Sequence, residues 1–204
     1  MNFPKGEFDF YTTLQKAFDD IDSNWMSYTG LLIAGSHEPT DVERKIELIR
    51  QARLTHTPFL GICLGMQLMA IEWARNVKGL ENANSTEIDR GTRYPVVVKL
   101  QERVVGRQPV VWFDGETTLE SHWNGYVVNP YYYPYFQDLD VSLGANGIEI
   151  MKLKDHSFFW GVQWHPEYQS SKDKPHHLLV NFIEACKKAS NKNTVVGGAR
   201  LSEN

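Results

Sequence analysis

The sequence predicts an α/β fold in three layers, with a mostly parallel sheet flanked by helices on both faces. Two short apolar runs, residues 31–34 and 58–62, are typical of strands that are buried on both faces. Each run is followed by a segment with apolar residues at helical spacing, 42–53 and 66–76. This alternation of strands and helices favours a parallel sheet, because the connecting helices must cover its faces.

Length and composition limit the kind of protein. With 204 residues, of which 42% are apolar, the chain can bury one sizeable core. We therefore expect residues 1–189 to form a single domain and the polar, glycine-bearing residues 190–204 to form a flexible tail. A net charge of −4 provides no basic surface for nucleic acid.

The expected compartment follows from the cysteines and the N-terminus. Cys63 and Cys186 show neither metal-type spacing nor a disulfide pattern, which favours a reducing compartment. The first ten residues lack the apolar core of a signal peptide, and no later apolar run is long enough to span a membrane. We expect a soluble, cytoplasmic protein without a metal or other cofactor. The candidate metal ligands His37, His122, His176 and His177 lack a spaced cysteine or carboxylate pattern and are interpreted as loop or surface residues.

The first half of the chain has clear helical segments but a weak start. Residues 13–20 form a plausible helix, and Asp41 is placed to cap the helix over 42–53. Residues 1–10 would make a poor strand, so one or two early strands of the expected sheet look missing or degenerate.

The second half contains several short strand-like runs separated by Gly, Asn, Asp and Pro, and we expect them to add antiparallel strands to the sheet. These runs are 95–100, 109–113, 126–129, 148–153 and 158–164. A closing helix is expected over 175–188, with Cys186 on its apolar stripe. The aromatic run 129–136 either packs over a core edge or forms a lip on a binding cleft, and we expect the lip.

The turn at Gly61-Ile62-Cys63-Leu64-Gly65 carries the strongest chemical signal. A buried strand leads into it and a helix leaves it, which is how a nucleophile elbow is built. The two glycines suit a strained strand-to-helix turn, where neighbouring β-carbons would clash. The thiol also lies at the positive end of the following helix dipole, which favours the thiolate. Cys63 is therefore a candidate nucleophile.

A cysteine nucleophile needs a base, and the base needs an orienting group. Both occur in Gly161-Val-Gln-Trp-His165-Pro-Glu167, where His165 follows an apolar strand and Glu167 stands two residues further on. Residues two apart in an extended segment point to the same side, so both side chains can face one cleft. We expect His165 to be the base and Glu167 to hold its tautomer.

The motifs Gly61-Ile-Cys-Leu-Gly-Met-Gln67 and Gly161-Val-Gln-Trp-His-Pro-Glu167 resemble those of the class I glutamine amidotransferases, which hydrolyse the side-chain amide of glutamine through a Cys-His-Glu triad. Ile71-Glu-Trp-Ala-Arg-Asn-Val77 and Ala83-Asn-Ser-Thr-Glu87 are similar to the glutaminase domain of CTP synthase in particular. The resemblance covers residues 30–188 and implies a flavodoxin-like sheet.

Carried over to this chain, the resemblance implies a role for each motif residue. Cys63 would form a γ-glutamyl thioester, with His165 and Glu167 completing the triad. Backbone N–H groups of Gly35 and Leu64 would form the oxyanion hole. Gln67 and Glu87 would hold the substrate, with Glu87 at its ammonium group.

The chain departs from this family at two places beside the expected site. Ser36 replaces the second glycine of the oxyanion loop. Gly125 stands before Tyr126, where the family has an arginine that grips the substrate carboxylate, so a bidentate clamp is missing there. Ser36, His122 and Tyr126 are accordingly expected around a modified pocket.

Three hypotheses for the function stay open. The first is a stand-alone amidohydrolase acting on glutamine or a close γ-glutamyl compound, with a synthetase as a possible partner that receives the ammonia. The second is a hydrolase of a larger γ-glutamyl conjugate, which Gly125 would suit. The third is a binding or regulatory protein that keeps the triad without useful turnover. The sequence contains no phosphate-binding loop of the Gly-rich Lys-Ser/Thr type, so we do not expect this chain to make CTP unaided.

Overall fold

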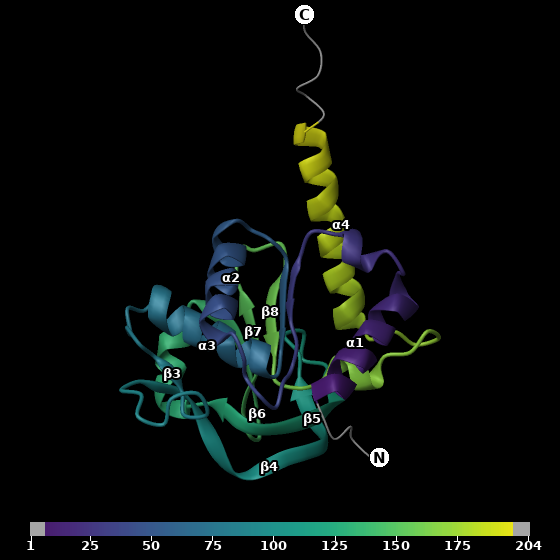
Figure 1. Ribbon diagram of the computed structural model, residues 1–204. Helices are drawn as coiled ribbons and strands as arrows, with labels where there is room; N and C mark the ends of the chain where they lie inside the picture. Colours follow the sequence, from purple (N-terminus) through teal and green to yellow (C-terminus); the bar gives the residue numbers. More distant parts are fainter. Residues whose placement is uncertain (1–6, 198–204) are drawn as a thin grey trace, which may run out of the picture.

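The computed structural model describes residues 7–197, and the side chains of residues 13–191. Two sheets and four α-helices make up the fold (Figure 1). The α-helices are α1 (Glu7–Ile21), α2 (Val42–Leu54), α3 (Leu64–Asn76) and α4 (His177–Gly197). The strands are β1 (Leu31–Ile33), β2 (Phe59–Ile62), β3 (Asn84–Ser85), β4 (Pro95–Val111), β5 (Thr117–Val128), β6 (Leu139–Gly144), β7 (Gly147–Leu153) and β8 (Phe159–Val162). Short 3-10 helices are η1 (Trp25–Ser27), η2 (Pro130–Phe136) and η3 (Pro166–Gln169).

The central sheet has five strands in the order β1-β2-β8-β7-β6. The pairs β1-β2 and β2-β8 are parallel, whereas β8-β7 and β7-β6 are antiparallel. The predicted three-layer α/β fold with antiparallel additions in the second half is therefore confirmed. No strand precedes β1 within residues 7–197, so β1 forms an edge of this sheet, as the weak start of the sequence indicated.

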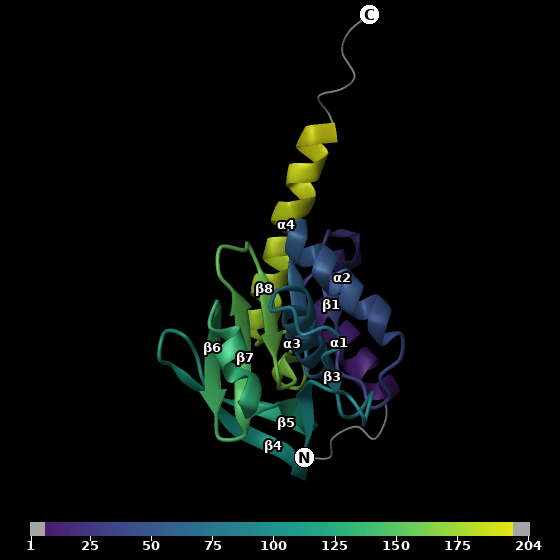
Figure 2. The ribbon, with the colours of Figure 1, turned by 90° about the vertical axis from the view of Figure 1, so that its left-hand side faces the viewer.

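Successive residues of β2 point to opposite faces and into different cores. Phe59 belongs to the core under α2 and α3, and Leu60 belongs to the core under α1 and α4. Figures 1 and 2 show these two pairs of helices on opposite sides of the sheet. Both faces of β2 are thus buried, which explains its continuous apolar sequence.

The second sheet corrects one expectation. The runs 95–100 and 109–113 belong to one long strand, β4, which pairs with β5 and β3 in a separate sheet instead of extending the central one. This β4-β5 ribbon runs across the end of the molecule opposite the free end of α4 (Figure 1).

Two local expectations also need correction, while the flexibility of the tail over 190–204 stays a prediction. Asp41 precedes α2 but has φ 49°, and its side chain makes no capping hydrogen bond. The aromatic run forms η2, with Tyr132 and Phe136 buried in the core, so it packs over the core and makes no lip on the cavity described below. Helix α4 continues through the expected tail to Gly197, and residues 198–204 lie outside the described residues. None of the described helices combines the length and apolarity needed to cross a bilayer.

Candidate active site

Cys63 lies between β2 and α3 in a strained backbone conformation. Its φ is 51° and its ψ −102°, a region that residues with a β-carbon rarely adopt. Its N–H donates to the carbonyl of Val162 at 2.8 Å, which ties the turn to the end of β8. The thiol therefore sits at the carboxyl end of the parallel strands, where ligands of α/β proteins bind.

The two elbow glycines are required by close backbone contacts. A β-carbon on Gly61 would lie 2.6 Å from the carbonyl carbon of Gly65, inside the first turn of α3. A β-carbon on Gly65 would lie 2.1 Å from the carbonyl oxygen of Ile33 in β1. Both distances are far below van der Waals contact, so these glycines allow strand and helix to approach as the elbow requires.

His165 and Glu167 meet as the sequence predicted. His165 Nδ1 lies 2.7 Å from Glu167 Oε1, and both side chains are buried. The backbone N–H of His165 donates to the carbonyl of Ser121 at 2.8 Å, which fixes this segment against β5. Since the carboxylate accepts, Nδ1 is the donor, and Nε2 faces the other way.

Gly35 marks where the histidine and the cysteine come together. A β-carbon on Gly35 would lie 2.6 Å from Cε1 of His165 and 3.4 Å from Cβ of Cys63. Burial by itself lowers the pKa of His165, but the charge of Glu167 and hydrogen bonds with Cys63 and Glu167 outweigh it and raise the pKa to about 10. The geometry thus favours an imidazolium beside the thiol.

A cavity of about 650 Å³ opens at Cys63. Its lining comes from the turn after β1, the start of α3, the segment after β3 and the β4-β5 sheet. The lining residues are Ser36, His37, Glu38, Cys63, Leu64, Gln67, Glu87, Arg103, Trp123, Asn124, Gly125 and Tyr126. Six of the site residues expected from the sequence therefore border one cavity: Ser36, Cys63, Leu64, Gln67, Glu87 and Tyr126.

Gln67 and Glu87 differ in how firmly they are held. Gln67 is buried, and its Nε2 donates to the carbonyl of Tyr126 at 3.0 Å. Glu87 is half-buried, and burial raises the pKa of its carboxyl group, against the charge of Arg103, which lowers it. Because burial weakens the screening of its charge by solvent, Glu87 is the carboxylate in this lining best suited to bind a cationic group.

The loop around Ser36 is closed by its own hydroxyl. Ser36 Oγ donates to the carbonyl of Glu38 at 2.9 Å and accepts from the N–H of Glu38 at 3.1 Å. The serine thus stabilises a local turn where the family has glycine.

His122 does not border the cavity, contrary to expectation. It is 1% exposed, with Nε2 2.8 Å from Glu149 and Nδ1 donating to the carbonyl of Glu120 at 3.0 Å. The interpretation of His122 as a loop or surface residue was therefore wrong, whereas His176 is buried but does lie in the loop before α4. His122 pairs with Glu149 instead, although the next four residues of β5, Trp123, Asn124, Gly125 and Tyr126, all border the cavity. No group of three or more possible metal ligands occurs among the described residues.

The sequence analysis missed two residues near Cys63: Gln163, which contacts its sulfur, and Arg103, which lines the cavity. The Nε2 atom of buried Gln163 lies 3.6 Å from the Cys63 sulfur. Its position two residues before His165 was an available signal, because alternate residues of an extended segment share a face. Arg103 was missed because it lies 40 residues from Cys63 in a segment without a motif.

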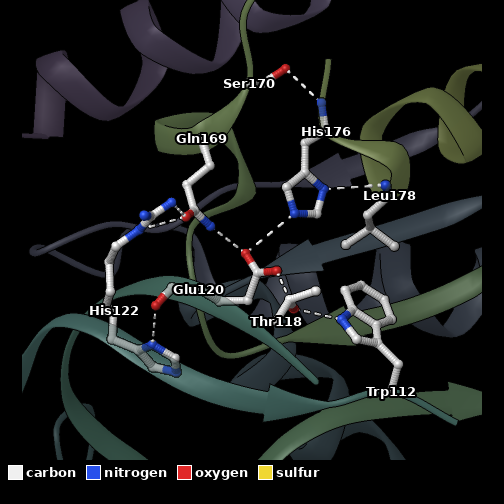
Figure 3. Close-up of polar contacts among 9 residues, drawn as sticks. Trp112, Thr118, Glu120, His122, Gln169, Ser170, His176 and Leu178 are labelled. Carbon is white, nitrogen blue, oxygen red and sulfur yellow. Dashed lines mark hydrogen bonds and ion pairs between the residues drawn. The ribbon is translucent and has the colours of Figure 1, made fainter. Parts of the chain in front are cut away.

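A buried polar network anchors the segment that carries Glu167. The carboxylate of Glu120 accepts hydrogen bonds from Thr118 and Gln169 and lies 3.2 Å from His176 Nε2 (Figure 3). Gln169 ends η3, two residues after Glu167, and its side-chain oxygen accepts from Arg107. Burial by itself raises the pKa of Glu120, but hydrogen bonds from His176 and Thr118 outweigh it and lower the pKa.

Replacing Glu120 with glutamine is expected to destabilise the fold. The carboxylate that accepts several hydrogen bonds becomes an amide with a single accepting oxygen, for which the donors then compete. We expect the free energy of unfolding to fall by about 2 kcal/mol. Because the Glu120 pKa is lowered on folding, this contribution is present above the ordinary pKa of 4.5 and is lost as the pH falls below it. Denaturant unfolding at pH 7 and at pH 3.5 checks both points. Exposed Glu81→Gln is the control, and equal stability of the two variants at pH 7 would contradict the role of the network.

The fold and the site define an α/β protein in which a cysteine at a strained strand-to-helix turn lies beside a buried His-Glu pair. A family model described as glutamine amidotransferase class-I matches residues 6–185, and the chain belongs to this family. The CTP synthase of Sulfolobus acidocaldarius is 36% identical over 193 residues, covering 83% of this chain and 36% of that enzyme. The CTP synthase of Thermotoga maritima is 40% identical over 181 residues, covering 75% of this chain and 34% of that enzyme. The chain thus spans about a third of the length of these relatives.

A solved structure confirms the fold. The glutaminase domain of Trypanosoma brucei CTPS with bound acivicin superposes with a TM-score of 0.79 at 22% identity, covering 87% of this chain and 88% of that one. At this identity the similarity concerns the arrangement of elements. The recognised resemblance to class I glutamine amidotransferases and to CTP synthase is confirmed.

Proposed function

We propose that this chain hydrolyses the γ-amide of glutamine, or of a close γ-glutamyl compound, at Cys63. The observation that carries the proposal is the strained thiol of Cys63 beside His165, at the floor of a cavity of about 650 Å³. Membership of the glutamine amidotransferase family supports the same reaction.

The reaction proceeds in two balanced steps. The thiolate of Cys63 attacks the amide carbon, and the imidazolium of His165 gives its proton to the leaving nitrogen, which departs as ammonia. Water then attacks the γ-glutamyl thioester, His165 takes the proton, and glutamate leaves as the thiol is restored. Glu167 holds Nδ1 of His165 throughout and stabilises the imidazolium.

The negative oxygen of each tetrahedral intermediate needs N–H donors close to Cys63. Leu64 supplies the first N–H of α3, which no carbonyl of that helix can accept. Gly35 supplies the second from the turn after β1, where its lack of a β-carbon leaves room for His165. We assign the oxyanion hole to these two N–H groups.

A larger γ-glutamyl conjugate is the second candidate substrate, and the cavity volume favours it. Glutamine fills only part of about 650 Å³, and drug-sized ligands occupy pockets of roughly 300–1,000 Å³. In both cases the reacting group is the γ-amide, and the leaving amine is the part that differs. With glutamine the product is ammonia, which a partner synthetase would consume.

The test combines turnover with mapping of a covalent adduct. We expect glutamine to yield glutamate and ammonia in equal amounts, and acivicin, an amino acid with a displaceable chlorine, to label Cys63. Cys186 is the internal control, because it is buried on α4 and burial raises its pKa to about 12. Cys63→Ala should lose both turnover and adduct, whereas Cys186→Ala should keep both.

The outcomes separate the three hypotheses. Turnover of bulky γ-glutamyl amides but not of glutamine would favour the conjugate hydrolase. Absence of both turnover and a Cys63 adduct would overturn the enzymatic proposal and leave a binding or regulatory protein.

A further inference from the structure

The strand pair β4-β5 is irregular beside the cavity. Lys99 pairs with Tyr126 and Val104 pairs with Asn124, so residues 100–103 of β4 stand opposite the single residue Gly125. An insertion of this kind bends its strand and turns a side chain in a new direction, and such bulges occur often beside active sites. Arg103 is the last residue of this bulge.

The bulge brings the guanidinium of Arg103 to the space beside Gly125. A β-carbon on Gly125 would lie 3.7 Å from Nε and 4.0 Å from Nη2 of Arg103. The same guanidinium lies over the ring of Trp123, with its carbon 5.7 Å from the ring centre. The Trp123 ring thus holds the arginine by a cation–π contact, and the planar donors of Arg103 stay in the cavity lining.

The cavity lining carries charges of both signs. Arg103 is the single arginine or lysine among the described lining residues, and no described carboxylate lies within the 4.0 Å of an ion pair with it. Its charge still acts on Glu87, where it opposes the effect of burial on the pKa. The cavity lining therefore holds one guanidinium with N–H donors available to a ligand, the half-buried carboxylate of Glu87 and the exposed carboxylate of Glu38.

A substrate with an α-amino acid head carries the complementary pair of charges. When its γ-amide reaches Cys63, its α-carboxylate and α-ammonium groups lie a few bonds away within the same cavity, which Arg103 and Glu87 also line. We propose that Arg103 binds the α-carboxylate of the substrate from β4, opposite Glu87. This inference rests on the proposed function, and it means that Gly125 marks a relocated clamp and not a lost one. The cavity then selects γ-glutamyl compounds whose α-carboxylate is unblocked.

The test compares L-glutamine with L-glutaminamide, in which a neutral amide replaces the α-carboxylate. We expect Arg103→Ala to lower kcat/KM for glutamine by about 10- to 100-fold, the range of a charge-assisted hydrogen bond, chiefly through KM. The value for glutaminamide should stay unchanged. Arg93→Ala is the matched control, because Arg93 also lies over an aromatic ring, that of Tyr94 at 5.2 Å, but outside the cavity lining.

A relocation variant tests the geometry itself. In Arg103→Ala, a second change Gly125→Arg should restore the preference for glutamine, because the side chain enters the space that the guanidinium left. Gly125→Arg alone should not improve it, since two guanidinium groups would then compete for that space. Equal losses on both substrates in Arg103→Ala, or no loss on glutamine, would overturn the assignment.

Binding separates this inference from the proposed reaction. If the wild-type chain hydrolyses neither compound, the proposed function fails, and calorimetry on Cys63→Ala decides the role of Arg103. The role of Arg103 is supported if Cys63→Ala binds glutamine more tightly than glutaminamide and this difference disappears when Arg103→Ala is added. Equal binding of the two compounds, or no binding of either, overturns it.

Discussion

Replacing Gly65 with alanine is expected to destabilise this protein more than any surface change. The added β-carbon would lie 2.1 Å from the carbonyl oxygen of Ile33, and neither backbone can yield without separating α3 from β1. Overpacking against a flexible side chain costs about 1–3 kcal/mol, so a clash between two backbones should cost about 3 kcal/mol or more. Unfolding by denaturant, followed by circular dichroism, measures the loss.

Gly91→Ala is the matched control for that substitution. Gly91 has no positive φ, and a β-carbon there would meet its nearest neighbour, Asp89 Oδ1, at 3.5 Å, an ordinary contact. We expect this variant to stay within about 0.5 kcal/mol of the wild type. A Gly65→Ala protein as stable as Gly91→Ala would show that the elbow is packed differently.

The change Glu167→Gln is expected to have the largest effect on rate among the isosteric substitutions. It removes the charge that raises the His165 pKa and offers Nδ1 an amide that can turn either way, so the correct tautomer is no longer fixed. A triad that loses its orienting carboxylate slows by about 10³- to 10⁴-fold in kcat. Steady-state ammonia release from glutamine measures this loss.

The same variant also lowers the pKa of His165, which changes how stability depends on pH. In the wild type the pKa of His165 is higher in the folded protein than its ordinary value of 6.5, so protonation of His165 stabilises the fold. This stabilisation is complete below pH 6.5 and is lost as the pH rises through about 10. Without the charge of Glu167 the His165 pKa falls, because burial lowers it and only Cys63 then opposes that effect. An NMR titration of the histidine rings follows the change.

Glu149→Gln controls for the loss of a buried carboxylate as such. Glu149 pairs with His122 at 2.8 Å, away from the cavity lining. We expect this variant to leave the titration of His165 in place. Identical His165 titrations in the wild type and Glu167→Gln would argue against the orienting role of Glu167.

The parallel half of the fold could be predicted because its signals are local. Strand β2 is a short apolar run buried on both faces, and α2 carries apolar residues at helical spacing. Strand β1 is also a short apolar run, but Leu31 and Leu32 are only partly buried because β1 is an edge strand. Each pattern follows directly from where the element lies in the layers. The boundaries of β2 and α3 shifted by only one or two residues from the expected ones.

The separation of β4 and β5 into their own sheet could not be predicted in this way. Strand β4 is mostly exposed or partly buried, and β5 contains a run of consecutive buried residues, so neither strand has a burial pattern that distinguishes the edge of the central sheet from a separate ribbon. Their partners are decided by long-range packing. Strand β6 was missed because its pattern is interrupted by exposed Leu143 and a register shift.

The residues of the candidate site likewise differ in whether local sequence could predict them. Cys63, His165 and Glu167 stand in short motifs whose backbone shape follows from glycine and proline, so their meeting could be predicted. Arg103 reaches the cavity only through a register shift, and no local pattern announces it. Residues that define a reaction are found in motifs, whereas here a residue that selects the substrate depends on how two strands pair.

The strained backbone at Cys63 also sets activity against stability. A residue with a β-carbon held at positive φ costs about 1–3 kcal/mol, and glycine would adopt the same backbone without that cost. The position that carries the reaction is therefore one where the chain would fold more readily without a side chain. Selection for a more stable fold would favour glycine at this position, whereas selection for a reactive thiol favours cysteine.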